Sequence, residues 1–307
     1  MTEGRGKFFS EVGYVIDAPC KINLHLRILG KRPDGFHDIE SIFMALNFGD
    51  TLFFELGGED GTCSIKLDRE SIPVHIEPGK NLIFKAVALF RSAAAFMPGV
   101  QVRLLKRIPL GGGLGGGSSD AASTLLAMQR LSGVELSEFM LGRIAADLGS
   151  DVPFFLKGGA AIVRGRGDVL KPVPQPRPLW FVLVCPGFSS GTADAFRLLD
   201  KWRPTEPAKN SVLGDEELVK ALKKEPEQWP FVNDFLPVFL KVGHPERAGA
   251  YRNMLEDLRK TGSVFCGLSG SGSVCFGVFT GKETAEMAVE ILKKKWNFVH
   301  LSFFLAC

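Results

Sequence analysis

Apolar and polar residues alternate between Cys20 and Leu29, with aliphatic side chains at positions 22, 24, 26 and 28 and polar ones at 21, 23, 25 and 27. A period of two predicts a β-strand with one apolar and one polar face. Lys21 and Asn23 then project from the same side of the strand, two residues apart. The sequence leaves two interpretations of that polar face: a site that faces a cleft, or an ordinary solvated surface.

Similar patterns predict the other elements. Short apolar runs predict further strands at 12–16, 39–46 and 51–56, which give an antiparallel sheet. Apolar residues at helical spacing run from the N-cap residue Asn81 to Phe96, where Pro98-Gly99 stops them. The elements expected after this helix are a strand at 100–106, helices from about 118–120 and over 136–148, a proline-rich transition at 172–178, a buried strand at 181–184 and a charged, helix-prone segment with a solvated face at 209–227. A strand at 274–279, a helix at 282–295 and a strand at 298–305 make the second half of the chain α+β.

Composition narrows the class of protein. The 307 residues suffice for two domains, and 45% hydrophobic with 23% charged residues is typical of a soluble globular protein. A net charge of +3 suits an anionic small molecule but is too small to indicate a nucleic-acid partner. Six cysteines without a C-x-x-C pair predict buried thiols in a reducing compartment, and five histidines without ligand spacing argue against zinc. Because no signal core and no apolar run of about 18 residues is present, we expect a cytoplasmic protein with no membrane partner.

The stretch from Pro109 to Ser119 reads P-L-G-G-G-L-G-G-G-S-S, with six glycines in eleven residues. It joins a predicted strand to a good helix former, so its backbone N–H groups and the helix N-terminus can face a bound anion. We therefore expect a phosphate cradle rather than a flexible linker. A Walker A loop is excluded, because Gly117 is followed by Ser118 without a lysine. A dinucleotide-binding unit is disfavoured, because a second helix follows instead of a strand.

A carboxylate stands in a break between two apolar elements. Asp151, in G-S-D-V-P-F-F, follows the end of a predicted helix, where a negative charge is disfavoured and needs a nearby cation. We expect Lys21 to be that cation.

Aromatic and polar residues gather in three other loops. Phe36 and His37 follow the turn signal Pro33-Asp34-Gly35, and an aromatic ring in such a loop can support a nucleobase. A polar loop predicted at 186–196 contains Thr192 and Phe196. A second glycine loop, G-L-S-G-S-G-S, covers 267–273.

Taken in order, the motifs A-P-C-K-I-N-L-H-L, R-P-D-G-F-H, P-L-G-G-G-L-G-G-G-S-S, G-S-D-V-P-F-F and G-L-S-G-S-G-S resemble those of the GHMP kinase superfamily. Within it, the sequence is similar to the kinases that phosphorylate 4-diphosphocytidyl-2-C-methyl-D-erythritol in isoprenoid biosynthesis. The resemblance implies an α+β, two-domain fold, with an N-terminal domain like ribosomal-protein S5 domain 2 at 1–170 and a ferredoxin-like domain at 171–307. It also implies that ATP lies along the loop from Pro109 to Ser119, with Mg²⁺ on its phosphates, and that the cytidine diphosphate-linked methylerythritol binds between the domains. No obligate protein partner is expected.

The resemblance assigns roles residue by residue. It implies that Lys21 and Asp151 are the catalytic pair. It implies that ATP is bound by Asn81, near the adenine, and by Pro109, Leu110, Gly111, Gly112, Gly113, Leu114, Gly115, Gly116, Gly117, Ser118 and Ser119. It implies that the substrate is bound by Asn23, Phe36, His37, Thr192 and Phe196, with Ser269, Gly270, Ser271 and Gly272, and Ser273 beyond them, near the transferred phosphoryl group. Two positions depart from the usual pattern: Phe36 replaces a tyrosine and Cys20 an alanine. The Mg²⁺ ligands are not identified, and Ser119 is a candidate.

These roles define a mechanism and its rivals. Asp151 would accept the proton of the 2-hydroxyl as that oxygen attacks the γ-phosphorus, and Lys21 would stabilise the negative charge. A homoserine or mevalonate kinase is a rival, but its acceptor has no base for Phe36 and Phe196 to contact. A catalytically silent GHMP-fold binding protein is another, and the presence of both catalytic residues argues against it.

Overall fold

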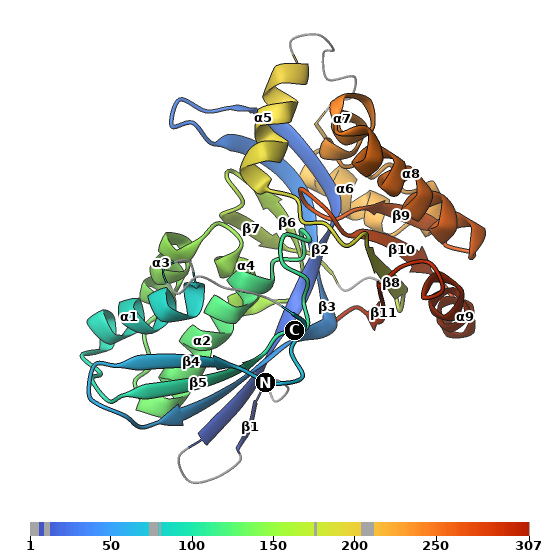
Figure 1. The fold of residues 1–307 in the computed structure, drawn as a ribbon. Helices are drawn as coiled ribbons and strands as arrows, with labels where there is room; N and C mark the ends of the chain where they lie inside the picture. The colour runs from blue at the N-terminus through green and yellow to red at the C-terminus, as the bar shows by residue number, and fades with distance from the viewer. Residues whose placement is uncertain are drawn as a thin grey trace.

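The structure, a computed structural model, describes residues 6–8, 13–73, 79, 81–174, 177–203 and 212–306. Val12, His75, Pro176, residues 209–211 and Cys307, on which parts of the sequence interpretation fall, lie outside these residues. Within the described part, two sheets carry all the named strands. Figure 1 shows that one long pair of strands runs through the molecule and reaches both of its ends.

The first sheet has seven strands in the described residues, with a path β1-β2-β3-β5-β4 and β6 and β7 branching from β3. The strands are β1 (Gly6–Phe8), β2 (Gly13–Lys31), β3 (His37–Leu56), β4 (Cys63–Leu67), β5 (Val100–Leu105), β6 (Ala160–Arg164) and β7 (Val169–Pro172). All their pairings are antiparallel except that of β4 with β5. The helices α1 (Leu82–Ala94), α2 (Gly116–Ser132), α3 (Glu138–Leu148) and α4 (Val152–Lys157) pack against one another and cover this sheet.

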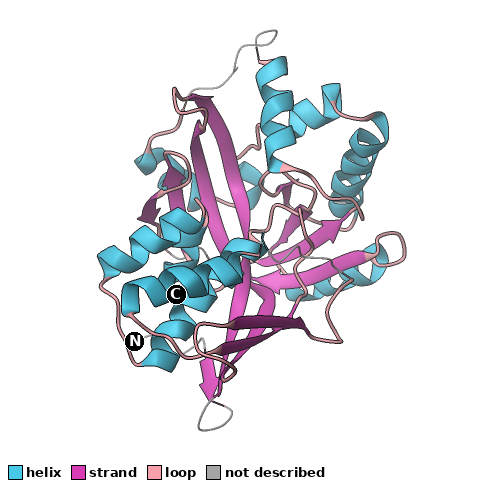
Figure 2. Ribbon diagram, turned by 60° about the vertical axis from the view of Figure 1, so that its left-hand side comes forward, coloured by secondary structure: helices cyan, strands magenta, loops and turns pink. Residues whose placement is uncertain are grey.

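The second sheet is antiparallel, in the order β11-β8-β10-β9. Its strands are β8 (Trp180–Cys185), β9 (Phe265–Leu268), β10 (Cys275–Phe279) and β11 (Phe298–Phe303). The other helical elements of the described chain are α5 (Thr192–Trp202), α6 (Asp215–Leu222), the short η2 (Pro226–Gln228), α7 (Phe235–Val242), α8 (Pro245–Lys260) and α9 (Lys282–Leu292). Figure 2 shows helices on both sides of the long strand pair. The domain boundary expected between residues 170 and 171 stays a prediction. It falls within β7.

The long pair β2 and β3 is continuous where the sequence predicted two strands on each side. Pro19 and the segment around Gly49 look like breaks in the sequence, but the pairing passes through them with register irregularities between Pro19 and Lys21 and between Asn23 and His25. Bulges of this kind bend a strand and redirect its side chains. They bracket the segment from Lys21 to Asn23, which pairs regularly with Phe43 to Ala45.

Both faces of the alternating segment are buried, so the solvated-surface interpretation was wrong. The aliphatic residues divide between two core clusters, with Ile22 and Leu24 in one and Leu26 and Ile28 in the other. The polar residues at 21, 23, 25 and 27 are also buried. Buried polar groups require hydrogen-bond partners, and His25 has one for each ring nitrogen. Its Nδ1 accepts from Val232 N at 3.2 Å, and its Nε2 lies 3.3 Å from Glu40 Oε1.

Candidate active site

Lys21 and Asp151 meet although they come from distant parts of the chain. The Nζ of Lys21, a buried residue of β2, lies 3.3 Å from Oδ2 of Asp151. Nζ also donates to Asn23 Oδ1 at 2.6 Å, and Asn23 Nδ2 donates to Ser41 Oγ at 3.0 Å. The expected cation is therefore beside the expected carboxylate, and the amide of Asn23 holds it there.

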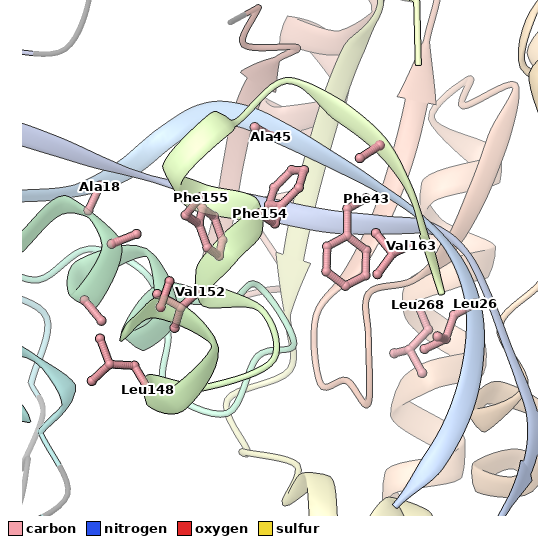
Figure 3. Packing of buried hydrophobic residues seen from close by; sticks show 14 of the residues in the cluster. Ala18, Leu26, Phe43, Ala45, Leu148, Val152, Phe154, Phe155, Val163 and Leu268 are labelled. Carbon is pink, nitrogen blue, oxygen red and sulfur yellow. The ribbon is translucent and has the colours of Figure 1, made fainter. Parts of the chain in front are cut away.

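Aromatic packing fixes the position of Asp151. Helix α4, which begins after this residue, places Phe154 edge-on against Phe43 of β3 at a ring distance of 5.4 Å, and Figure 3 shows these rings together in the core. The ammonium of Lys21 lies 4.3 Å from the centre of the same Phe43 ring. The sequence placed Asp151 after the C-terminus of a helix, and α3 does end nearby, at Leu148. Asp151 also directly precedes the N-terminus of α4. The positive end of α4 favours the carboxylate there.

The first glycine loop forms the expected turn ahead of a helix. Gly111, Gly113 and Gly115 have φ values of 63°, 77° and 72°, in the left-handed region that favours glycine. Helix α2 begins at Gly116, slightly earlier than predicted, and its first intrahelical bond runs from Ser119 N to Gly115 O at 2.9 Å. The N–H groups of residues 116–118 therefore have no intrahelical acceptor and can bind an anion.

The second glycine loop locks onto the first. Ser273 N donates to Gly111 O at 3.1 Å, and Ser269 Oγ donates to Gly113 O at 2.9 Å. A Cβ at Gly113 would lie 2.0 Å from Ser269 O. Close backbone approach therefore requires glycine at position 113, and Ser269 serves as a structural contact between the loops.

One cavity of about 1010 Å³ joins these features. Its size lies at the upper end of the range for small-ligand pockets, which suits a site for two substrates. It is lined by most of the residues that the sequence nominated, namely Lys21, Asn23, Phe36, His37, residues 109–118, Asp151, Thr192, Phe196, Gly270 and Ser271. Asn81, Ser119, Ser269, Gly272 and Ser273 are not among the lining residues.

The local hydrogen bonding of two of these five residues bears on their predicted roles. Asn81 caps α1, where its side chain accepts from Ile83 N at 2.9 Å, so its role toward adenine stays a prediction. Ser119 lies in the first turn of α2, and its buried Oγ has no hydrogen-bond partner in the described part of the chain. A hydroxyl oxygen in that position fits a hard cation such as Mg²⁺. No cluster of three or more His, Cys, Asp or Glu residues suited to a metal occurs among the described residues.

The far end of the cavity carries the aromatic residues. His37 stacks on Phe196 at a ring distance of 4.6 Å, and His37 Nε2 lies 2.7 Å from Oδ1 of Asp200. Asp200 also accepts from Lys31 Nζ at 2.9 Å. Although burial opposes the shift, the hydrogen bonds from Lys31 and His37 lower the pKa of Asp200 below its usual value. Thr192, Phe196 and Asp200 lie on α5, so the prediction of a loop through 186–196 was wrong at its end: the turn residues stop at Gly191, which caps the helix.

Sequence reasoning also missed a buried charge cluster beneath the phosphate loop. Lys106 Nζ donates to Asp50 Oδ2 at 2.5 Å and to Asp120 Oδ2 at 2.8 Å, and all three residues are buried. Burial raises the pKa of Asp120 to about 7, Lys106 opposes that shift and Asp50 adds to it. Lys106 lines the cavity, and a Cβ at Gly116 would lie 3.1 Å from its Nζ. The sequence carries little signal of this cluster, because Asp50 and Asp120 lie 56 and 14 positions from Lys106 and no local pattern links the three residues.

Two family models match the chain. Residues 81–159 match the GHMP kinases N terminal domain, and residues 236–297 match the GHMP kinases C terminal. Among the described residues, no helix is long and apolar enough to cross a membrane.

Relatives and solved structures narrow the family. A 4-diphosphocytidyl-2-C-methyl-D-erythritol kinase from Chromobacterium violaceum is 34% identical over 91% of this chain and 91% of its own, and one from Solibacter usitatus is 38% identical over 90% and 84%. A crystal structure of 4-(cytidine 5'-diphospho)-2C-methyl-D-erythritol kinase matches with a TM-score of 0.78 and 32% identity, over 95% of this chain and 100% of that one. A homoserine kinase from Cytophaga hutchinsonii, with a TM-score of 0.65 and 18% identity over 98% and 97% of the two chains, shares the fold alone.

These matches confirm the α+β GHMP kinase fold that the motifs implied, and with it the use of ATP. At this identity over most of both chains, the protein belongs to the 4-diphosphocytidyl-2-C-methyl-D-erythritol kinase family of GHMP kinases.

Proposed function

We propose that this enzyme transfers the γ-phosphoryl group of ATP to the 2-hydroxyl of 4-diphosphocytidyl-2-C-methyl-D-erythritol, giving the 2-phosphate and ADP in the route to isoprenoid precursors. The observation that carries the proposal is the position of the Lys21–Asp151 pair. It lies in the same cavity as the glycine loop and the aromatic residues. Phosphoryl transfer depends mainly on positioning and charge stabilisation, and this arrangement provides both.

ATP lies along residues 109–119 in this proposal. The left-handed glycines and the N–H groups at the start of α2 bind the phosphates. Ser119 Oγ, a buried oxygen without a partner in the described chain, would hold Mg²⁺. That ion, when bound, neutralises charge on the phosphates.

Asp151 accepts the proton of the attacking hydroxyl. Its carboxylate lies 3.3 Å from the Lys21 ammonium, which stabilises negative charge on the attacking oxygen and on the transferred group. Asn23 keeps the ammonium aimed at this point through its 2.6 Å hydrogen bond. Lys21 and Asp151 thus divide the chemistry into charge stabilisation and proton transfer.

The cytosine lies among Phe36, His37 and Phe196. A neutral His37 whose Nε2–H is donated to Asp200 has an accepting Nδ1. A hydrogen-bond acceptor at this point can pair with the exocyclic amino group of cytosine. It would repel the carbonyl oxygen that uracil has at the same position. This pairing gives the pocket a chemical reason to select a cytidyl substrate.

The test is ATP consumption by purified protein with 4-diphosphocytidyl-2-C-methyl-D-erythritol, homoserine or mevalonate, with phosphorus NMR of each product. We expect turnover and a new phosphomonoester signal with the cytidyl substrate alone. Turnover of homoserine or mevalonate in its place would contradict the proposed specificity, and no turnover of any acceptor would contradict the activity.

A further inference from the structure

We propose that Arg166 binds the diphosphate of the cytidyl substrate, an inference that rests on the proposed function. The substrate has three parts in a fixed order: a base, a diphosphate and a methylerythritol. The base is assigned to Phe36 and His37, and the acceptor hydroxyl to Asp151. The diphosphate must therefore pass between these two ends of the cavity, and a cation is expected there.

The turn between β6 and β7 occupies this intermediate position. Its residue Gly167 lies against Asp151, since a Cβ at Gly167 would be 3.8 Å from Asp151 Oδ1. On its other side, Gly165 O accepts from Ile39 N at 2.8 Å, which ties the turn to the start of β3 beside His37. Both glycines have positive φ, at 63° for Gly165 and 109° for Gly167. The turn is thus bonded to the base end and packed against the reacting end.

Arg166 stands between those two glycines and lines the cavity. Its guanidinium carbon lies 4.8 Å from the centre of the Phe36 ring. The ion pair that it forms, from Nε to Asp168 Oδ2, is 3.9 Å long, and the Asp168 carboxylate instead accepts a 3.0 Å hydrogen bond from the Arg166 backbone N–H. The side chain is partly exposed and retains donors for an incoming anion.

Of the other cations that line the cavity near the base end, Lys31 and Arg197 are more tightly engaged and Lys201 is an ammonium. Lys31 donates to Asp200 at 2.9 Å, and Arg197 forms a closer ion pair with Asp194. A guanidinium offers a planar fork of donors that matches two phosphate oxygens, which an ammonium does not. Both position and chemistry therefore favour Arg166.

The test compares fragments of the substrate on the whole enzyme. The affinities of CDP and cytidine are measured by calorimetry for wild type, Arg166→Gln, Arg166→Lys and, as a charge-matched control, Arg259→Gln, at an exposed arginine of α8 that does not line the cavity. A lost charge-assisted hydrogen bond weakens binding by about 10- to 100-fold. We expect that loss for CDP with Arg166→Gln, little change for cytidine, and a smaller loss with Arg166→Lys.

Three results would overturn the assignment. Equal losses for CDP and cytidine would mean that Arg166 only supports the Phe36 ring. Equal losses of CDP affinity in the Arg166→Gln and Arg259→Gln variants would mean that Arg166 acts through the overall charge of the protein rather than through a contact with the diphosphate. Unchanged CDP affinity in Arg166→Gln, with wild type still binding CDP and turning over the cytidyl substrate, would reject the Arg166 role alone, whereas failure of wild type to bind either ligand would reject the proposed function with it.

Discussion

The ammonium of Lys21 and the carboxylate of Asp151 lie 3.3 Å apart, and the ring of Phe43 helps to position both groups. Phe43 supports the Lys21 ammonium at 4.3 Å and packs against Phe154, which anchors the helix that follows Asp151. The pair is therefore held by the core of the first sheet, as a preorganised catalytic site requires. Substrate binding does not need to assemble it.

The lock between the two glycine loops can be tested at Gly113. A Cβ in Gly113→Ala would meet Ser269 O at 2.0 Å and would also strain a backbone with φ of 77°. We expect a loss of about 3 kcal/mol or more in the free energy of unfolding and a large rise in KM for ATP.

Gly133→Ala is the matched control, because Gly133 has a φ of 68° but nothing within 4 Å of an added Cβ. It should cost about 1 kcal/mol from strain alone and leave KM for ATP unchanged. Urea unfolding and initial-rate kinetics measure both quantities. Similar losses in the two variants would show that the contact between the loops has no energetic role.

Phe36 offers a test of the base pocket. Its side chain is 51% exposed in the absence of a ligand, so truncation in Phe36→Ala should leave the fold stable. Base stacking on an aromatic ring is worth about 1–3 kcal/mol, which predicts a rise in KM for the cytidyl substrate of about 5- to 150-fold with KM for ATP unchanged. Phe139→Ala, at a more exposed phenylalanine on α3, should change neither constant. An unaltered KM in Phe36→Ala would return this ring to a packing role.

Asp120 predicts a pH dependence of stability. Burial raises its pKa from the ordinary value of 3.8 to about 7. Between these two pH values, the folded state therefore holds a proton that the unfolded state has released. The stabilisation is complete below the unfolded pKa and disappears as pH rises through about 7. The side chain of the Asp120→Asn variant cannot ionise, so its stability lacks this pH-dependent contribution.

The measurement is the free energy of unfolding of both proteins between about pH 5 and pH 8. The variant should gain stability relative to wild type as pH rises, by up to about 1.4 kcal/mol per pH unit. A difference that is independent of pH would show that Asp120 titrates as an ordinary carboxylate.

The sequence predicted the features that depend on local chemistry. The alternation from 20 to 29 placed Lys21 and Asn23 together, and the six glycines before a helix former indicated an anion site, because strand period and glycine conformation are local properties. The loop at 36–37 was likewise recognisable from its turn residues.

Features that depend on distant residues were missed. Asp200 bonds to His37 across the space between α5 and the start of β3, and no local pattern links them. Lys106 likewise finds Asp50 and Asp120 only in the folded chain. The continuity of β2 through Pro19 was missed because proline reads as a break, although a bulge in the register accommodates it.

The most direct test of the account is the kcat of Asp151→Asn with the cytidyl substrate, measured beside the affinities for that substrate and for ATP. Asp147→Asn, on the exposed side of α3, is the matched control. Loss of a general base predicts a fall in kcat on the order of 10²-fold or more with both affinities nearly unchanged, while Asp147→Asn keeps wild-type kcat. A near-wild-type kcat in Asp151→Asn would contradict the proposed transfer at the Lys21–Asp151 pair.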